Sequence, residues 1–116
     1  MNASLRISVF NYLLLSMMLL RVSTSTAQST HRIDSLLLTL ETMKEDTFKA
    51  NLLSEITKSY MVELNILEKV AEYSNKVFVL SKKINFKRGI AVGIFYKGFF
   101  HWSKGNYVPA LYYYKQ

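Results

Sequence analysis

Three runs of apolar residues in the first part of the chain recur at the spacing of an α-helix. Within each run, successive apolar positions are three or four residues apart, so they would share one helix face. The runs are Ile33, Leu36, Leu37, Leu40 and Met43; Phe48, Leu52, Leu53, Ile56 and Tyr60; and Ile66, Val70, Tyr73, Val77, Leu80 and Ile84. The pattern therefore predicts three amphipathic helices, the first beginning between residues 30 and 34.

The residues between these runs favour helix ends. Asp46 or Thr47 can accept hydrogen bonds from the free amides at the start of the second helix, and Asn85 is expected to end the third. Glu72 and Lys76 lie four residues apart, so we expect them to pair on the surface of the third helix.

Residues 87–116 fit two different secondary structures. Aromatic and β-branched residues lie on both sides of the turn at residues 103–106, as in a β-hairpin. Neither side alternates apolar with polar residues, however, and Pro109 would remove a hydrogen-bond donor from the middle of the second strand. Because proline is well tolerated in the first turn of a helix, we expect two helices here rather than a hairpin.

The N-terminal segment has the pattern of a secretory signal peptide. Arg6 precedes a mostly apolar run at residues 7–20, and the small residues 25–27 precede Gln28, which predicts cleavage after Ala27. A membrane anchor and a buried helix are the alternatives, but the run spans only about 21 Å as a helix, against roughly 30 Å of bilayer hydrocarbon. We expect an exported protein, periplasmic or extracytoplasmic, and the absence of cysteine excludes a lipid-anchored lipoprotein.

Charge is distributed unevenly along the chain. Eight Lys and Arg residues and no Asp or Glu lie from Lys76 onward, and the formal net charge is +7. Such a basic half favours binding to nucleic acid or anionic surfaces. Because an exported protein rarely meets nucleic acid and the cations are spread as far as Lys115, we favour a solvated face or attraction to anionic envelope surfaces.

Two segments resemble the tetratricopeptide repeat, a pair of antiparallel helices of about 34 residues with the pattern W-x-x-L-G-x-x-Y, then A-x-x-x-F. The later segment has this spacing at Ile94, Lys97, Gly98, His101, Ala110 and Tyr114, and the earlier one at Leu53, Ile56, Thr57, Tyr60, Val70 and Ser74. The second-helix positions of the two segments are 40 residues apart, from Val70 to Ala110 and from Ser74 to Tyr114.

This resemblance implies an all-α fold, in which antiparallel helix hairpins form a truncated tetratricopeptide-like α-solenoid after an N-terminal signal-peptide helix. The implied segments are a signal peptide at 1–27, a leading helix at 28–46, a degenerate repeat at 47–86 and a second, incomplete repeat at 87–116.

Packing and binding would use different residues of these repeats. Residues expected to pack the helices together are Tyr60, Val70, Ser74, Gly98, Ala110 and Tyr114. The first helix of each repeat is expected to line a concave surface that receives peptides or partner helices. Residues expected on that surface are Asn51, Ser54, Lys58, Phe95, Phe99 and Trp102. An aromatic stripe is also typical of a core, and its exposure here could reflect the absence of a covering repeat.

The order of segments is similar to the start of certain bacterial envelope sensors. In that family the repeats lie outside the cytoplasmic membrane and precede a membrane span and an output domain, commonly a histidine kinase or a DNA-binding domain. None of the output machinery is present in these 116 residues. The resemblance therefore implies a non-catalytic module whose partners are a protein or peptide, or further repeats and the output domain of the same protein.

Residues for catalysis or cofactor binding are scarce. The chain has no cysteine and two histidines, His31 in the expected flexible start of the mature chain and His101 at an expected repeat-core position. Covalent catalysis needs a nucleophile, a base and an orienting group together. The sequence also lacks a glycine-rich phosphate loop and metal-ligand spacing, so we expect neither an enzyme nor a cofactor.

Repeat arrays need about three repeats and a polar capping helix for stability. We therefore expect the chain to be a fragment of a longer protein, or the product of an interrupted reading frame, that alone is marginally stable or self-associating. Two functional classes remain. One is an interaction module of an exported or membrane-anchored signalling protein; the other is a free-standing exported helical protein that binds anionic surfaces or nucleic acid. In the second class, the binding residues are Lys82, Lys83, Lys87 and Arg88.

Overall fold

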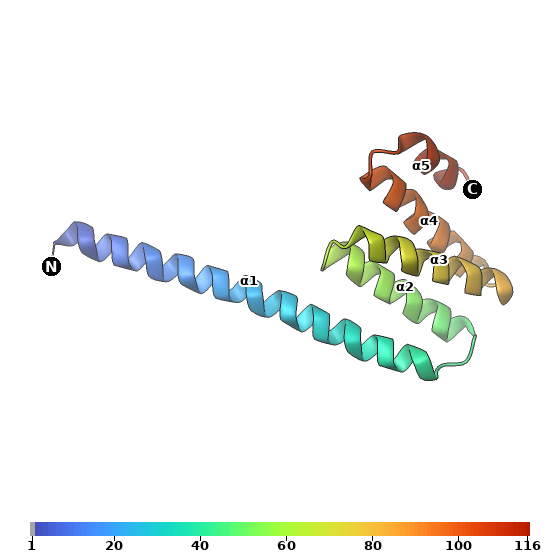
Figure 1. Cartoon of the computed structure of the whole chain (residues 1–116), viewed down its shortest axis with the longest axis horizontal. Coiled ribbons are helices and arrows are strands. Elements are labelled where there is room, and N and C mark those ends of the chain that lie inside the picture. The colour runs from blue at the N-terminus through green and yellow to red at the C-terminus, as the bar shows by residue number, and fades with distance from the viewer. Residues whose placement is uncertain (1) are drawn as a thin grey trace.

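A computed structural model describes residues 2–116, apart from the side chains of residues 22 and 23. Within that range the chain forms five α-helices and no strand (Figure 1). The helices are α1 (Ala3–Thr42), α2 (Thr47–Val62), α3 (Leu67–Lys83), α4 (Lys87–Ser103) and α5 (Tyr107–Tyr114). The all-α prediction is confirmed, and the alternative of a hairpin at residues 87–116 is wrong. Met1 and the two omitted side chains, which belong to the predicted signal peptide, lie outside the described residues.

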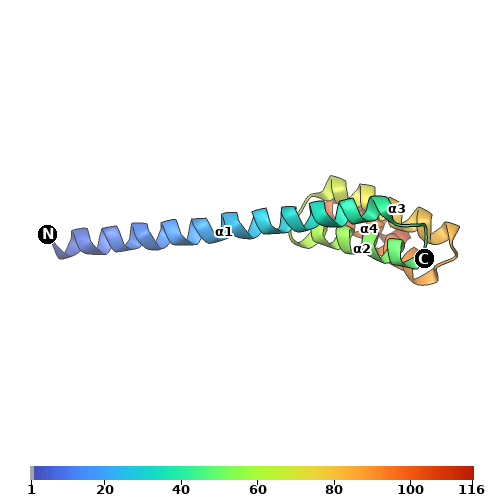
Figure 2. The same cartoon turned by 90° about the horizontal axis from the view of Figure 1, so that it is seen from below.

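Helix α1 projects far beyond the other helices (Figures 1 and 2). The described side chains of its N-terminal half are exposed, whereas Ile33, in its second half, is buried in the core. The segments predicted as a signal peptide and a leading helix are thus parts of one continuous helix that ends at Thr42. This projection explains why the molecule measures 71 × 38 × 18 Å.

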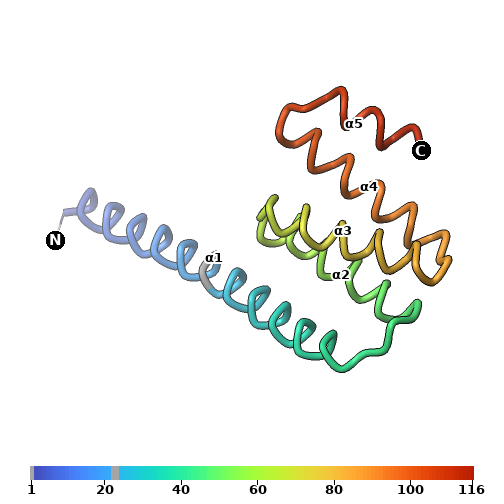
Figure 3. Tube along the Cα trace, turned by 45° about the vertical axis from the view of Figure 1, so that its right-hand side comes forward, coloured from blue at the N-terminus to red at the C-terminus, as the bar shows by residue number. Residues whose placement is uncertain are grey.

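Helices α2 to α5 run alternately in opposite directions, and each packs on the helix before it (Figure 3). Helix α2 also contacts α4, so the first helices of the pairs α2/α3 and α4/α5 are neighbours. The centre of the core consists of side chains from α2 and α3 that are wholly buried, namely Ala50, Ile56, Val70 and Val77.

The four helices after α1 begin at intervals of 20 residues, at Thr47, Leu67, Lys87 and Tyr107. Equivalent helices of the two pairs are therefore 40 residues apart, from 47 to 87 and from 67 to 107. The turns between helices repeat at the same interval. Their left-handed residues have φ angles of 52°, 55° and 77° at Asn65, Asn85 and Gly105, respectively.

Left-handed residues of this kind end helices. After α3, the Phe86 amide donates to the Ser81 carbonyl at 2.8 Å, and Asn85 is the left-handed residue between them. The equivalent bond after α4 closes residues 101–106 around Gly105. Both turns are Schellman motifs, which satisfy carbonyls at the helix end and reverse the chain.

The predicted helix starts near Asp46 and Pro109 agree with the structure, whereas the start predicted between residues 30 and 34 is wrong, because α1 already begins at Ala3. The Asp46 carboxylate accepts a hydrogen bond from the Lys49 amide at 3.0 Å, so Asp46 caps α2. Pro109 is the third residue of α5 and lies in its first turn, where its missing N–H removes no hydrogen bond from the helix.

Helices α3 and α4 approach closely because α4 places two glycines against α3. A Cβ on Gly93 would lie 3.0 Å from the Phe78 Cα, and one on Gly89 would lie 2.0 Å from Ser81 Oγ. Ser81 Oγ is buried and has no hydrogen-bond partner among the described residues. The α3–α4 interface therefore depends on the absence of side chains at two positions of α4.

Candidate functional site

A groove with a volume of about 580 Å³ runs between the end of α1 and the first helices of the two pairs, α2 and α4. Its apolar lining consists of Met43, Phe48, Leu52, Val92 and Tyr96, and its polar lining includes Asn51, Glu55 and Arg88. Apolar lining with a few polar groups is the usual character of a site that receives a peptide or a helix.

None of the apolar residues that line the groove is among the residues predicted for binding. The signal that reveals it is the 40-residue interval, because Leu52 and Val92 are equivalent residues on α2 and α4 and both line the groove. Arg88, which the sequence places in the basic half of the chain, also lies at this groove.

The structure brings together only some of the residues predicted for the binding surface. Asn51 and Ser54 line the groove, although the Ser54 hydroxyl donates to the Ala50 carbonyl of its own helix at 3.0 Å. Lys58 is exposed farther along α2. Phe95 lies at a different hollow, between α4 and α5, where its ring centroid is 6.2 Å from that of Tyr114.

The other two predicted aromatic residues differ in burial. Phe99 is partly buried and packs against the core. Trp102 is 55% exposed, and its ring centroid lies 6.3 Å from that of Phe99. Only Asn51 and Ser54 of the six residues therefore line the groove itself.

The residues predicted to pack the repeats lie at the helix interfaces. Tyr60, Val70, Ser74, Gly98 and Ala110 are buried, whereas Tyr114 is exposed at the end of α5. A Cβ on Gly98 would lie 2.5 Å from Tyr114 Cε1, so the Tyr114 ring occupies the space that Gly98 leaves open.

A second hollow, of about 370 Å³, lies between α4 and α5 and is lined mainly by apolar residues. Ile90 and Tyr113 belong to this lining. Their equivalents in the first pair, Ala50 and Tyr73, are buried in the core of the array. The surface between the two helices of the second pair is therefore accessible, whereas the equivalent surface of the first pair is buried.

The basic residues 82, 83, 87 and 88 surround the turn between α3 and α4. Lys83 pairs with Glu45, and the hydrogen bond from Lys83 lowers the pKa of the Glu45 carboxyl. Lys82, Lys87 and Arg88 form no ion pair with the described residues. Because Glu45 follows the C-terminal end of α1, this basic turn lies at the opposite end of α1 from its apolar half.

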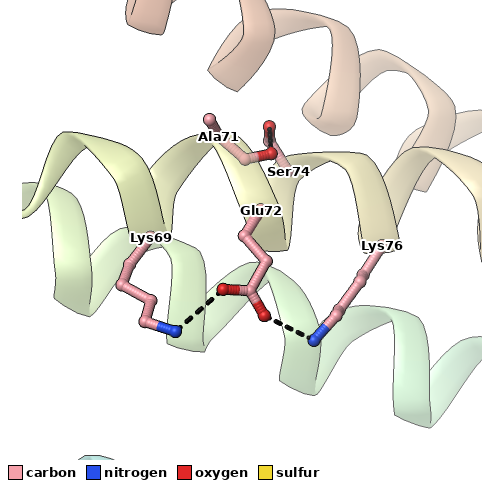
Figure 4. Close-up of polar contacts among 5 residues, drawn as sticks. All are labelled: Lys69, Ala71, Glu72, Ser74 and Lys76. Carbon is pink, nitrogen blue, oxygen red and sulfur yellow. Dashed lines mark hydrogen bonds and ion pairs between the residues drawn. The ribbon is translucent and has the colours of Figure 1, made fainter.

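The predicted ion pair between Glu72 and Lys76 on α3 is present, and Lys69 also pairs with Glu72 (Figure 4). Glu72 accepts from both Lys69 and Lys76 at 2.8 Å, and these two hydrogen bonds lower the pKa of the Glu72 carboxyl. All three side chains are substantially exposed, as expected of a solvated helix face, where ion pairs add little stability. On another side of α3, the Ser74 hydroxyl donates to the Ala71 carbonyl at 2.9 Å.

The two histidines lie in different parts of the molecule. His31 is exposed on α1, whereas His101 is half-buried and stacks on Tyr113 with ring centroids 5.4 Å apart. Burial lowers the pKa of nearby Lys97, with a smaller contribution from Lys82. No group of three or more His, Asp or Glu residues suited to a metal ion occurs among the residues that the structure describes.

Helix α1 is long and apolar enough to cross a membrane by length and composition. It contains an 18-residue window with a mean hydropathy of 1.6, none of which is buried in the protein. The window spans about 27 Å as a helix, close to the thickness of bilayer hydrocarbon and longer than the run at residues 7–20. A signal peptide and a membrane span are both compatible with this helix.

In comparisons with known proteins, no family model, no curated protein and no solved structure matches this chain. The resemblance to tetratricopeptide repeats rests on residue spacing, accompanied by the regular helix intervals described above.

Proposed function

We propose that this chain is a non-catalytic interaction module of an exported or membrane-anchored protein, and that the groove between α1, α2 and α4 receives a peptide or a partner helix. The groove itself is the observation that carries the proposal. Equivalent residues Leu52 and Val92 supply apolar contacts from two adjacent helices, and Asn51 and Arg88 supply polar groups beside them. Helical repeat proteins bind peptides along surfaces of this kind.

The module belongs, in this proposal, to a tetratricopeptide-like signalling protein. The 40-residue interval between equivalent helices supports a repeat architecture. Its partners are a peptide, or further repeats and the output domain of the same protein. The apolar N-terminal half of α1 supports export or anchoring.

Binding of an anionic surface by the basic turn is the second candidate function. Lys82, Lys87 and Arg88 support it because they form no ion pair with the described residues. The turn lies near the end of α1, about 33 Å along the helix from residue 20. This distance is several times the Debye length of about 8 Å at physiological salt, so this function suits a free exported form better than an anchored one.

A random peptide library displayed on phage, selected on the purified chain, tests the main proposal. Selected peptides are then titrated by calorimetry against Asn51→Arg and Arg88→Glu, which alter the groove, and against Asn75→Arg as a control. Asn75 is exposed and does not line the groove. We expect each groove substitution to weaken binding about tenfold, or about 1.4 kcal/mol, and the control to leave it unchanged.

Equal affinity for the groove and control variants would overturn the proposal. Binding to DNA or anionic vesicles that disappears on neutralisation of Lys82, Lys87 and Arg88, together with no selected peptide, would instead support the second candidate.

A further inference from the structure

The turns α2–α3 and α4–α5 lie on the same side of the helical array and form one edge, which we name the turn edge. Its large exposed apolar residues are Val62, Ile66, Trp102, Tyr107 and Val108. Trp102 is equivalent to Val62, 40 residues earlier, so the second pair repeats an exposed apolar residue that the first pair already carries.

A following helix pair would leave much of this edge exposed. Val62 is 65% exposed even though α4 and α5 follow its own helix pair. Val108 is equivalent to Glu68, whose side chain is also largely exposed in the first pair. Continuation of the array by the same packing therefore does not account for Trp102 and Val108, although it would partly cover Tyr107, whose equivalent Leu67 is half-buried.

The turn edge faces the apolar half of α1. Arg32 of α1 donates to Ser59 Oγ at 2.6 Å and to a Glu63 carboxylate oxygen at 2.5 Å, so the end of α2 lies level with this part of α1. Because α2 to α5 alternate in direction, the α4–α5 turn lies on the same side (Figure 1). The apolar half of α1 projects from this side of the array.

Helix geometry brings the turn edge close to any bilayer that holds α1. Arg21 is the first charged residue after the apolar run at residues 7–20. Ser29, which lies beside Glu63 at this edge, is eight residues further on, or about 12 Å along the helix. The headgroup layer of each leaflet is about 5–7 Å thick. Membrane helices are commonly tilted by about 20°. In a molecule 38 Å wide, such a tilt lowers the far side by roughly 13 Å, which is enough to bring the turn edge onto the headgroup layer.

The carboxylates at this edge do not oppose contact with lipid headgroups. Glu63 pairs with Arg32, and Glu68 pairs with Lys104 at 2.8 Å. Tryptophan and tyrosine side chains favour the membrane–water interface because they combine an apolar ring with a polar atom. Trp102 and Tyr107, on either side of the α4–α5 turn, have this chemistry.

We propose that, with α1 in a bilayer, the turn edge rests on the headgroup layer of that bilayer and inserts Trp102 and Tyr107 into the interface. The inference rests on the membrane-anchored form of the proposed function and is independent of the peptide groove. A bilayer suits this edge better than a second copy of the chain, because α1 holds the edge beside the lipid in every molecule.

Trp102 is the only tryptophan in the chain, so its fluorescence tests the proposal directly. The full chain is reconstituted in phosphatidylcholine vesicles, and its emission is compared with that in vesicles of brominated phosphatidylcholine. We expect brominated lipid to quench most of the Trp102 emission, and unbrominated lipid to shift that emission to shorter wavelength relative to detergent.

The matched control combines Trp102→Phe with Phe48→Trp. Phe48 is exposed at the start of α2, at the opposite edge of the array, so a tryptophan there should remain unquenched. Quenching of Trp102 no stronger than at position 48 would overturn the proposal. A blue shift that depends on protein concentration, without lipid quenching, would also overturn it and would indicate a second copy as the occupant.

Peptide binding to the groove, measured on the same vesicles, separates the two proposals. Intact peptide binding without lipid quenching overturns only the contact between the turn edge and the bilayer. Lipid quenching without peptide binding overturns only the groove.

Discussion

Single residues of α4 control how closely it packs on its neighbours. Gly93 lies against the backbone of Phe78, which belongs to the middle of α3, whereas Gly98 lies against the ring of Tyr114 at the end of α5. The two glycines therefore differ in what an added methyl group would displace. A side chain near a chain end can rotate away, but the backbone of a packed helix cannot move without repacking the interface.

We predict that Gly93→Ala lowers the free energy of unfolding by about 1–3 kcal/mol through overpacking, although alanine favours a helix by about 1 kcal/mol over glycine. Gly98→Ala should be nearly neutral, because rotation of Tyr114 offsets the clash. Urea unfolding followed by circular dichroism measures both, and Ala91→Gly at an exposed position of α4 reports the helix-propensity contribution alone. A Gly93→Ala variant as stable as the native chain would show that α3 and α4 separate without cost.

Local chemistry was predictable from the sequence at this scale, but interfaces between helices were not. Asp46 as a cap and the Glu72–Lys76 pair both depend on residues within four positions of each other. The role of Gly93 depends on Phe78, fifteen positions away on another helix. Apolar periodicity identifies the buried face of a helix, but it does not identify the residues of the next helix that contact this face.

At the scale of helices, the turn residues set the antiparallel order. Asn85 has a φ of 55° and lies inside the Schellman turn that joins α3 to α4. Asparagine tolerates this left-handed conformation better than most residues with a Cβ, and glycine tolerates it best. The sequence predicted an end near Asn85, because the periodic apolar run stops at Ile84.

We predict that Asn85→Ala lowers the free energy of unfolding by about 1 kcal/mol, because the left-handed conformation costs about 1–2 kcal/mol for a residue such as alanine. Asn85→Gly should be neutral or slightly stabilising, since glycine adopts positive φ without steric cost. Thermal and urea unfolding of the two variants test this difference. Equal stability of the alanine and glycine variants would contradict a conformational role for Asn85.

The helix order was predictable after residue 30, whereas the form of α1 was not. The signal-peptide pattern places a boundary after Ala27, and amphipathic periodicity begins only near residue 30, so neither pattern predicts that α1 continues through Ala27. The groove was missed for a different reason. It requires α1, α2 and α4 to meet, and contacts among three helices are not encoded in the period of any one of them.

For the whole molecule, the ionisable groups limit stability at both ends of the pH range. Hydrogen bonds from Lys83, Ser29 and Lys104 are the main causes that lower the pKa values of Glu45, Glu63 and Glu68, respectively. Burial raises the pKa values of Tyr60 and Tyr96. The folded state thus favours ionised carboxylates and neutral phenols relative to the unfolded state.

We predict that Tm is nearly constant around neutral pH and falls on both sides. On the acid side the fall begins near the ordinary carboxyl pKa of 4.5 and continues as pH drops through the lowered folded values. On the alkaline side the fall in Tm begins near the ordinary phenol pKa of 10.0. At that pH the tyrosines of the unfolded chain ionise, whereas burial keeps Tyr60 and Tyr96 neutral in the folded state. Calorimetry across this range measures both limits.

Replacement of Glu45 and Glu68 by glutamine is the matched test of the acid limit. It should reduce the loss of Tm between pH 5 and pH 3 and leave the alkaline side unchanged. The reduction should be modest, because both carboxylates are exposed and solvent screens their ion pairs. If the variant loses as much Tm between pH 5 and pH 3 as the native chain, the acid-side loss of stability arises from other groups.

The continuity of α1 gives the molecule a mechanical property. Kinks in helices arise mainly at proline and glycine, and residues 3–42 contain neither, so no such hinge separates the apolar half from the half that packs on α2. Thr39, near the far end of this rod, forms part of the groove wall. A rotation or tilt of the apolar half therefore moves the other end of α1 as well, and with it the wall of the groove in which a peptide would bind.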